Sequence, residues 1–216
     1  MLEAKNIEKN YGELGILKGI NLSVAGAEII SIVGSSGAGK TTLLQILGTL
    51  DKPSKGQLLI EGKDPFALNE KALAHFRNQR LGFVFQFHQL LPEFTAQENI
   101  AIPAMIGGSN QTDALKKAQT LLERFGLESR AQHKPEALSG GEQQRIAVAR
   151  ALINQPALVF ADEPSGNLDT ENANALHNLF LELREEMKQS FVIVTHNANF
   201  AQMADRCLTM QDGQFV

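Results

Sequence analysis

The sequence predicts an α/β fold with a mainly parallel sheet. Short apolar runs alternate with longer segments whose apolar residues recur at helical spacing. The apolar runs lead directly into polar residues, as buried strands do where they reach a ligand-binding edge of a sheet. A glycine-rich stretch also lies between one such run and a helical segment. Together these observations indicate buried parallel strands that are connected by helices.

The expected elements can be placed in order along the chain. Strands are expected at Glu28–Val33, Gln57–Ile60, Leu81–Phe85, Ala157–Ala161 and Phe191–Thr195. Helices are expected from the glycine-rich stretch to about Leu50, at Thr112–Phe125 with Thr112 as its cap, at about Glu142–Ile153, and at Thr170–Lys188. No linker or repeat divides the chain. We therefore expect a single domain over residues 1–216, within which the mostly helical segment of about 87–150 forms a sub-domain.

The composition is that of an ordinary globular protein. The chain has 216 residues, and its 24 acidic and 20 basic side chains give a formal net charge of −4. The chain lacks the excess of basic residues that is typical of nucleic-acid-binding domains, so no nucleic-acid partner is expected. No apolar run is long enough to span a membrane, and no signal peptide is recognisable, so we expect a reduced, cytoplasmic chain. The single cysteine, Cys207, excludes an internal disulfide and is expected to be buried or half-buried.

Residues Gly34–Thr41 fit the pattern of a phosphate-binding loop, Gly-x-x-x-x-Gly-Lys-Thr. The loop follows a predicted strand and opens a helix, which is the context that this motif requires. Glycines let the backbone wrap closely round a phosphate, and a helix N-terminus adds partial positive charge. Lys40 is expected to reach the β- and γ-phosphates, and the Thr41 hydroxyl to bind Mg²⁺. The residues expected to bind the nucleotide here are Gly34, Ser35, Ser36, Gly37, Ala38, Gly39, Lys40, Thr41 and Thr42.

Asp162 and Glu163 follow the predicted strand Ala157–Ala161. A strand that ends in this way places carboxylates at the carboxyl edge of the sheet, beside the phosphates. Asp162 is expected to hold Mg²⁺, and Glu163 to orient or deprotonate the attacking water. Alone, such a pair is most often a solvated strand end, but the phosphate loop makes the catalytic interpretation the stronger one. The two motifs indicate a nucleoside triphosphatase or a phosphotransferase.

The segment Leu138–Arg145, with the sequence LSGGEQQR, resembles the signature motif of the ATP-binding cassette (ABC) ATPases. Ser139, Gly140 and Gly141 also open a helix, and so form a second anion-binding N-terminus. The resemblance implies that these residues cap the γ-phosphate of an ATP held by a second copy, in a head-to-tail homodimer. It also implies a P-loop NTPase fold, with a RecA-like parallel core, a helical signature sub-domain and a small antiparallel β sub-domain. An ordinary Ser-capped helix is the weaker alternative.

Further positions resemble other ABC motifs. Gln86 matches the glutamine that senses Mg²⁺ and the γ-phosphate, and Asp169 matches the aspartate that works across the dimer interface. His196 matches the switch histidine at the γ-phosphate, and Tyr11 matches the aromatic residue that stacks on adenine. Histidines that match no such position are given no catalytic role, and these are His75, His88, His133 and His177.

The resemblance therefore implies Mg²⁺-dependent ATP hydrolysis in which Lys40, Gln86, Glu163 and His196 are catalytic. The implied metal ligands are Thr41, Gln86 and Asp162. ATP binding would close two copies, with Tyr11, Lys40 and Thr41 of one facing Ser139, Gly140, Gly141 and Asp169 of the other, and hydrolysis would reopen them. A soluble ABC protein acting on DNA or ribosomes is an alternative, but this chain has one phosphate loop and no sustained heptads.

The segment Leu81–Pro103 is similar to the LolD branch within the group of ABC ATPases that also contains MacB and FtsE. This resemblance implies a motor subunit that powers a membrane permease from the cytoplasmic face of the inner membrane, in lipoprotein release or export. MacB-like efflux and FtsE-like control of cell-division assembly are the alternatives. A permease helix is expected to dock near Gln86–Phe94, on an apolar groove offered by Phe87, Leu90, Leu91 and Phe94 unless these side chains are core.

Overall fold

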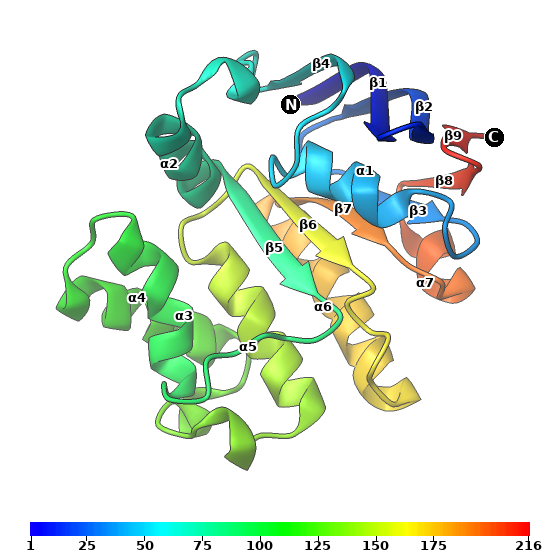
Figure 1. The fold of residues 1–216 in the computed structure, drawn as a ribbon. Coiled ribbons are helices and arrows are strands. Elements are labelled where there is room, and N and C mark those ends of the chain that lie inside the picture. The colour runs from blue at the N-terminus through cyan, green and yellow to red at the C-terminus, as the bar shows by residue number, and fades with distance from the viewer.

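A six-stranded sheet runs through the middle of the molecule (Figure 1). The computed structural model describes residues 1–216. All neighbouring strands pair in parallel except the last two, which are antiparallel. The mainly parallel sheet predicted from the sequence is confirmed. In spatial order the strands are β5 (Leu81–Phe85), β6 (Leu158–Asp162), β7 (Ser190–Val194), β3 (Ile29–Val33), β8 (Arg206–Gln211) and β9 (Gln214–Phe215).

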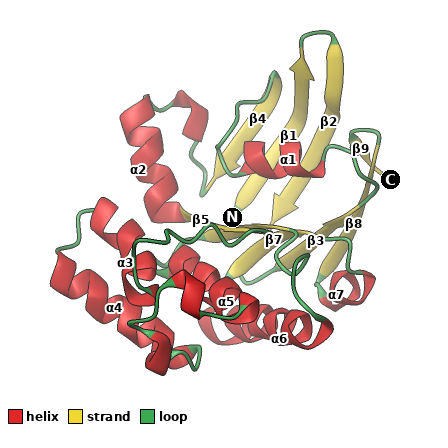
Figure 2. Cartoon of the chain, turned by 60° about the horizontal axis from the view of Figure 1, so that its bottom comes forward, coloured by secondary structure: helices red, strands yellow, loops and turns green.

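A second, three-stranded sheet forms the small antiparallel β sub-domain. Its strands lie in the order β2 (Leu14–Val24), β1 (Leu2–Tyr11) and β4 (Lys55–Ile60), and both pairs are antiparallel. Helix α1 (Lys40–Leu47) lies between this sheet and the six-stranded one (Figure 2). The sub-domain that the ABC resemblance implied is therefore present.

The remaining helices pack mainly on the opposite side of the six-stranded sheet, as Figure 2 shows. They are α3 (Ala96–Ile106), α4 (Gln111–Arg124), α5 (Gly140–Leu152), α6 (Thr170–Met187) and α7 (Ala198–Met203), while α2 (Glu70–Arg80) connects β4 to β5. The segment from residue 87 to residue 150 contains α3, α4 and most of α5, which pack against one another. No helix of the chain combines the length and the apolar composition that crossing a lipid bilayer requires.

The central strands bury both of their faces. Along β6, Val159 and Ala161 belong to the apolar core beneath α5 and α6, whereas Leu158 and Phe160 belong to the core beneath α1. Successive side chains of a strand point to opposite faces, so a strand covered on both sides is apolar at nearly every position. This burial explains why β3, β6 and β7 are recognisable as unbroken apolar runs.

Three local expectations are wrong. Asn110 caps α4, because its side chain accepts the Asp113 N–H over 2.9 Å, and Thr112 lies inside the first turn. Helix α1 ends at Leu47 rather than near Leu50, because Thr49 takes up a left-handed φ of 62°. Cys207 is exposed rather than buried or half-buried. It lies on β8, whose outer neighbour is the two-residue strand β9, so much of β8 faces solvent.

Candidate functional site

The phosphate-binding loop joins β3 to α1. Gly34 and Gly39 take up φ angles of 154° and 101°, and a Cβ on Gly34 would lie 2.1 Å from the Met210 carbonyl oxygen, so this position requires glycine. Lys40, the first residue of α1, donates to the carbonyl oxygens of Gly34 and Ser35 over 2.8 and 2.9 Å. The loop therefore holds a buried ammonium group at the N-terminus of a helix, and both features attract an anion.

Thr41 and Asp162 meet at the carboxyl edge of the sheet. Asp162 is the last residue of β6, and Thr41 lies in the first turn of α1. The Thr41 hydroxyl donates to Oδ2 of Asp162 over 3.0 Å. Burial raises the pKa of the Asp162 carboxyl, although the Thr41 hydrogen bond opposes this shift. A hydroxyl and a carboxylate oxygen are hard ligands of the kind that Mg²⁺ takes, so this pair of side chains fits that ion.

Glu163 and His196 form the other half of the acidic edge. Glu163 takes up a left-handed φ of 47°, and its N–H donates to the Val194 carbonyl oxygen over 2.9 Å. Its Oε2 atom accepts the His196 main-chain N–H over 3.0 Å, and the His196 Nε2 atom lies 3.1 Å from Oε1. Burial raises the pKa of the Glu163 carboxyl. A carboxylate with a raised pKa beside a phosphate loop is suited to accept a proton from water.

One cavity of about 310 Å³ brings most of these residues together. Residues predicted from the sequence that line it are Ser36, Gly37, Gly39, Lys40, Thr41, Thr42, Asp162, Glu163 and His196. Ile16 and Val194 also line the cavity and were not predicted. Val194 ends β7 close to His196, so its position on the strand could have indicated it. Ile16 comes from β2, where nothing in the sequence signals a nucleotide.

Three residues of the predicted loop do not line this cavity. Gly34 and Ser35 contribute the carbonyl oxygens that hold the Lys40 ammonium group. Ala38 is buried, and its methyl group lies 3.5 Å from where a Cβ on Gly34 would be. Their place in the structure is to shape the loop.

Gln86 lies directly after β5, at the edge of the same acidic group. Its side-chain amide donates to the Asn167 Oδ1 atom over 3.1 Å, and the Asn167 amide donates to the Gln86 carbonyl oxygen over 3.2 Å. A smaller cavity of about 270 Å³ is lined by Gln86 together with Thr41, Asp162 and Glu163. The structure thus places Gln86 next to the predicted metal ligands.

The signature motif begins α5 away from the phosphate cavity. The Ser139 hydroxyl accepts the Glu142 N–H over 3.2 Å, and a Glu142 carboxylate oxygen accepts the Ser139 N–H over 2.8 Å, which together make a capping box. The hydrogen bond from Arg130 lowers the pKa of Glu142 to about 2. Ser139 and Gly140 are exposed, and none of Ser139, Gly140 and Gly141 lines the phosphate cavity.

Tyr11 and Asp169 also lie outside the phosphate cavity. Asp169 caps α6, since its Oδ1 atom accepts the Asn172 N–H over 2.9 Å. Tyr11 is 51% exposed, and its hydroxyl donates to Asp51 over 2.8 Å. The Lys9 ammonium group lies 4.8 Å from the centre of the Tyr11 ring and donates to the other oxygen of Asp51 over 2.7 Å. In the single chain, Tyr11 is therefore held by Lys9 and Asp51, and Asp169 by the first turn of α6.

Comparison with known proteins identifies the family. Residues 17–166 match the family model described as ABC transporter. The chain is 56% identical to a lipoprotein-releasing system ATP-binding protein LolD of Cytophaga hutchinsonii, over 100% of this chain and 99% of that one. It is 55% identical to a LolD of Bacteroides fragilis, over the whole of both chains.

Solved structures agree with this result. A dimeric post-hydrolysis state of the ATP-binding cassette MJ0796, bound to ADP and Pi, matches with a TM-score of 0.89 and 38% identity, over 100% of this chain and 96% of that one. CbiO1 of Clostridium perfringens matches with a TM-score of 0.90 and 27% identity, over 100% and 86%. The chain belongs to the ABC transporter family, in which it is an ATP-hydrolysing motor subunit.

Proposed function

We propose that this ATPase drives a lipoprotein-releasing transporter. The observation that carries the ATPase activity is the grouping of Lys40, Thr41, Asp162, Glu163 and His196 round one cavity. This grouping supplies a phosphate-binding cation, oxygen ligands for a metal ion and a proton acceptor, which are the parts of a nucleoside triphosphatase site that one chain provides. The full-length identity to LolD proteins supports lipoprotein release over MacB-like efflux or FtsE-like control of division.

The side chains divide the chemistry among themselves. Lys40 and the loop amides bind the β- and γ-phosphates, and Lys40 exchanges its carbonyl partners for phosphate oxygens. Thr41 and Asp162 would hold Mg²⁺, which would neutralise charge on the phosphates. Glu163 orients the attacking water and accepts its proton, while the His196 main-chain N–H holds the Oε2 atom of that carboxylate and its Oε1 atom, which has no hydrogen-bond partner, stays available to the water. Gln86 joins this group from β5.

A second copy of the chain completes the site. Ser139, Gly140 and Gly141 begin a helix whose exposed N-terminus has no phosphate of its own chain to bind. In a head-to-tail dimer this N-terminus and Asp169 would cover the nucleotide held by the partner's loop, with Tyr11 stacked on the adenine. Matching solved cassettes are described as dimeric, which supports this assembly.

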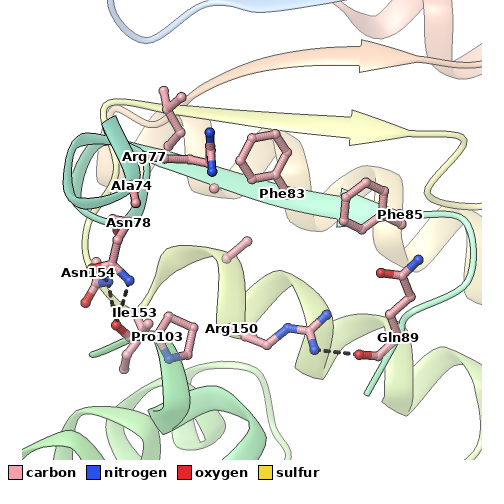
Figure 3. Close-up of a pocket in the computed structure, with 13 residues that line it drawn as sticks. Ala74, Arg77, Asn78, Phe83, Phe85, Gln89, Pro103, Arg150, Ile153 and Asn154 are labelled. Carbon is pink, nitrogen blue, oxygen red and sulfur yellow. Dashed lines mark hydrogen bonds between the residues drawn. The ribbon is translucent and has the colours of Figure 1, made fainter. Parts of the chain in front are cut away.

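The permease partner docks beside β5. A cavity of about 390 Å³ is lined by Phe83 and Phe85 of β5 and by Arg150 of α5, among others (Figure 3). Arg150 donates to the carbonyl oxygens of His88 and Gln89, and Arg77 donates to Thr49, so neither guanidinium group faces a carboxylate. Such a groove suits an amphipathic helix that carries an acidic residue.

The segment that borders this groove supports the same partner. Phe87, Leu91 and Phe94 are exposed, with 68%, 42% and 40% of their surface accessible, whereas Leu90 is buried and belongs to the core. Three of the four apolar side chains therefore remain available to a permease helix. We place the chain on the cytoplasmic face of the inner membrane, held there by this contact.

All 216 residues act as one ATPase domain, in which the segment 87–150 is the helical sub-domain.

Replacement of the proposed base tests the catalytic assignment. Glu163→Gln should abolish ATP turnover and trap an ATP-bound dimer, because the amide cannot accept the proton while the phosphate loop stays intact. Turnover and size-exclusion chromatography with ATP measure the two effects. Glu128→Gln, at an exposed site on a short helix, is the matched control and should behave as the wild type. A Glu163→Gln protein that is monomeric and fully active would contradict the assignment.

Reconstitution tests the transported substrate. The chain is purified from membranes together with the integral-membrane protein that binds it, and the complex is placed in proteoliposomes that contain a fluorescent triacylated lipoprotein. ATP should transfer the lipoprotein to a soluble acyl-chain acceptor, and the same complex with Glu163→Gln should not. ATP-dependent movement of a small amphiphile with no lipoprotein release would favour the efflux alternative instead.

A further inference from the structure

His177, on α6, is the one histidine of the chain with a buried side chain, at 2% exposed. No role is predicted for this residue from the sequence, and it does not line the phosphate cavity. A histidine is costly to bury unless its ring nitrogens find partners and its flat faces are packed. The contacts of His177 therefore need an explanation in terms of what they join.

The two sides of the ring contact two different segments. The imidazole stacks on the Phe200 ring, with centroids 4.1 Å apart and planes 6° from parallel. At its edge, the Nε2 atom forms a hydrogen bond with the Ser165 hydroxyl over 2.9 Å. Phe200 is fully buried on α7, and Ser165 lies in the loop before α6. One side chain thus ties that loop to α7.

Each of these segments also carries a residue of the acidic edge. Ser165 comes two residues after Glu163, and Phe200 comes four residues after His196. Strands β6 and β7 hold the start of the two segments, where the Glu163 N–H donates to the Val194 carbonyl oxygen. Beyond the strands, only a loop and the six-residue helix α7 continue them. The Glu163–His196 contacts at 3.0 and 3.1 Å join the first of these segments to the second.

We propose that His177 is a positioning residue that sets the Glu163–His196 geometry by linking Ser165 to Phe200. Burial lowers the pKa of His177 to about 4, so the ring is neutral at physiological pH and can pair with a hydroxyl. The proposal rests on the catalytic roles proposed above for Glu163 and His196. A displacement of reacting groups by about 1 Å can lower a rate by about 100-fold, so a link of this kind has a measurable effect.

Three variants of the complete chain separate the two contacts. His177→Phe keeps a ring for the stack and removes the hydrogen bond, Ser165→Ala removes the bond from the other side, and His177→Gln restores a group that can pair with Ser165. We expect His177→Phe and Ser165→Ala each to lower kcat about tenfold or more, with KM for ATP within about twofold of the wild type. The double variant should be no worse than either single one, and His177→Gln should recover most of the lost kcat.

A control variant separates an effect on kcat from a loss of stability. Leu122→Ala, in the buried face of α4, should lower the unfolding temperature at least as much as His177→Phe or Ser165→Ala does, while its kcat stays at the wild-type value. Wild-type kcat in His177→Phe and Ser165→Ala, or additive losses in the double variant, would overturn the proposal. If Glu163→Gln retained turnover, the catalytic assignment would fail instead. If His177→Phe did not fold, Ser165→Ala and His177→Gln would still decide the question.

Discussion

The Thr41 hydroxyl and a carboxylate oxygen of Asp162 lie 3.0 Å apart, although 121 positions separate the two residues in the sequence. The contact joins the first turn of α1 to the end of β6, and so connects the phosphate loop with the acidic edge of the sheet. Two oxygen ligands already in contact can take up a hard cation with little rearrangement.

Substitutions at Thr41 test whether this pair binds Mg²⁺. Thr41→Val keeps the shape of the side chain and removes the hydroxyl, so the Mg²⁺ concentration that gives half-maximal ATPase activity should rise at least about tenfold. Thr41→Ser keeps the hydroxyl and should stay close to the wild type. ATPase assays over a Mg²⁺ titration provide the measurement. Equal Mg²⁺ requirements for Thr41→Val and Thr41→Ser would exclude Thr41 as a ligand.

The parallel core could be predicted because burial on both faces leaves its strands apolar throughout. The three-stranded sheet was harder to locate. Strand β1 carries charged residues on its outer face, as Lys5 and Glu8 illustrate, and this weakens its apolar pattern. Helix α2 buries no residue completely, so it has little apolar periodicity to recognise.

The phosphate loop and the acidic edge could be predicted because each is a short motif directly beside a strand. Contacts between distant segments that belong to no known motif could not be predicted. Nothing local links Tyr11 to Asp51, or His177 to both Ser165 and Phe200, since these pairs form only when the sheets and helices pack. A buried histidine cannot be told from an exposed one by its immediate neighbours in the sequence.

Tyr11 should report nucleotide binding directly, because it is the only tyrosine and the chain has no tryptophan. Tyr11→Ala should weaken ATP binding by roughly 1–3 kcal/mol, or about 5- to 150-fold, through loss of stacking. Tyr11→Phe keeps the ring and should lose far less. Equilibrium binding of a fluorescent ATP analogue measures both variants. Equal losses in the two variants would show that the hydroxyl, not the ring, contacts the nucleotide.

The hydrogen bond to Asp51 gives the wild-type tyrosine a spectroscopic signature. It raises the pKa of the Tyr11 phenol, with burial and the Asp51 charge as smaller causes. Asp51→Asn should therefore lower that pKa toward its ordinary value, and an ultraviolet titration of the single tyrosine measures the shift. An unchanged titration curve would contradict the contact between the two side chains.

Ser139 offers a way to separate helix capping from contact with a partner's nucleotide. Ser139→Ala removes a capping side chain and should destabilise the protein by about 1 kcal/mol. Asn110→Ala removes a comparable cap from α4 and is the matched control. Only Ser139→Ala should also abolish ATP-induced dimerisation and lower turnover. Similar turnover in both variants would mean that Ser139 serves its own helix alone.

His177 should make the stability of the protein depend on pH in a definite direction. Its pKa falls from 6.5 to about 4 on burial, so the unfolded chain binds the proton more readily than the folded one. The contribution of the neutral His177 to the free energy of unfolding is therefore fully present above pH 6.5. It is lost as the pH falls from 6.5 toward 4, and about 2 kcal/mol of it is lost at pH 5.

Urea unfolding at a series of pH values measures this dependence. His177→Phe has no titrating group at this position. The free energy of unfolding of the wild type should therefore fall relative to that of this variant by about 2 kcal/mol from pH 7 to pH 5. Exposed carboxylates titrate in both proteins and cancel in the difference. His75→Gln, at an exposed site on α2, serves as the control and should follow the wild type. A difference that stays constant with pH would mean that the imidazole is protonated inside the fold, where it would face the Phe200 ring as a cation.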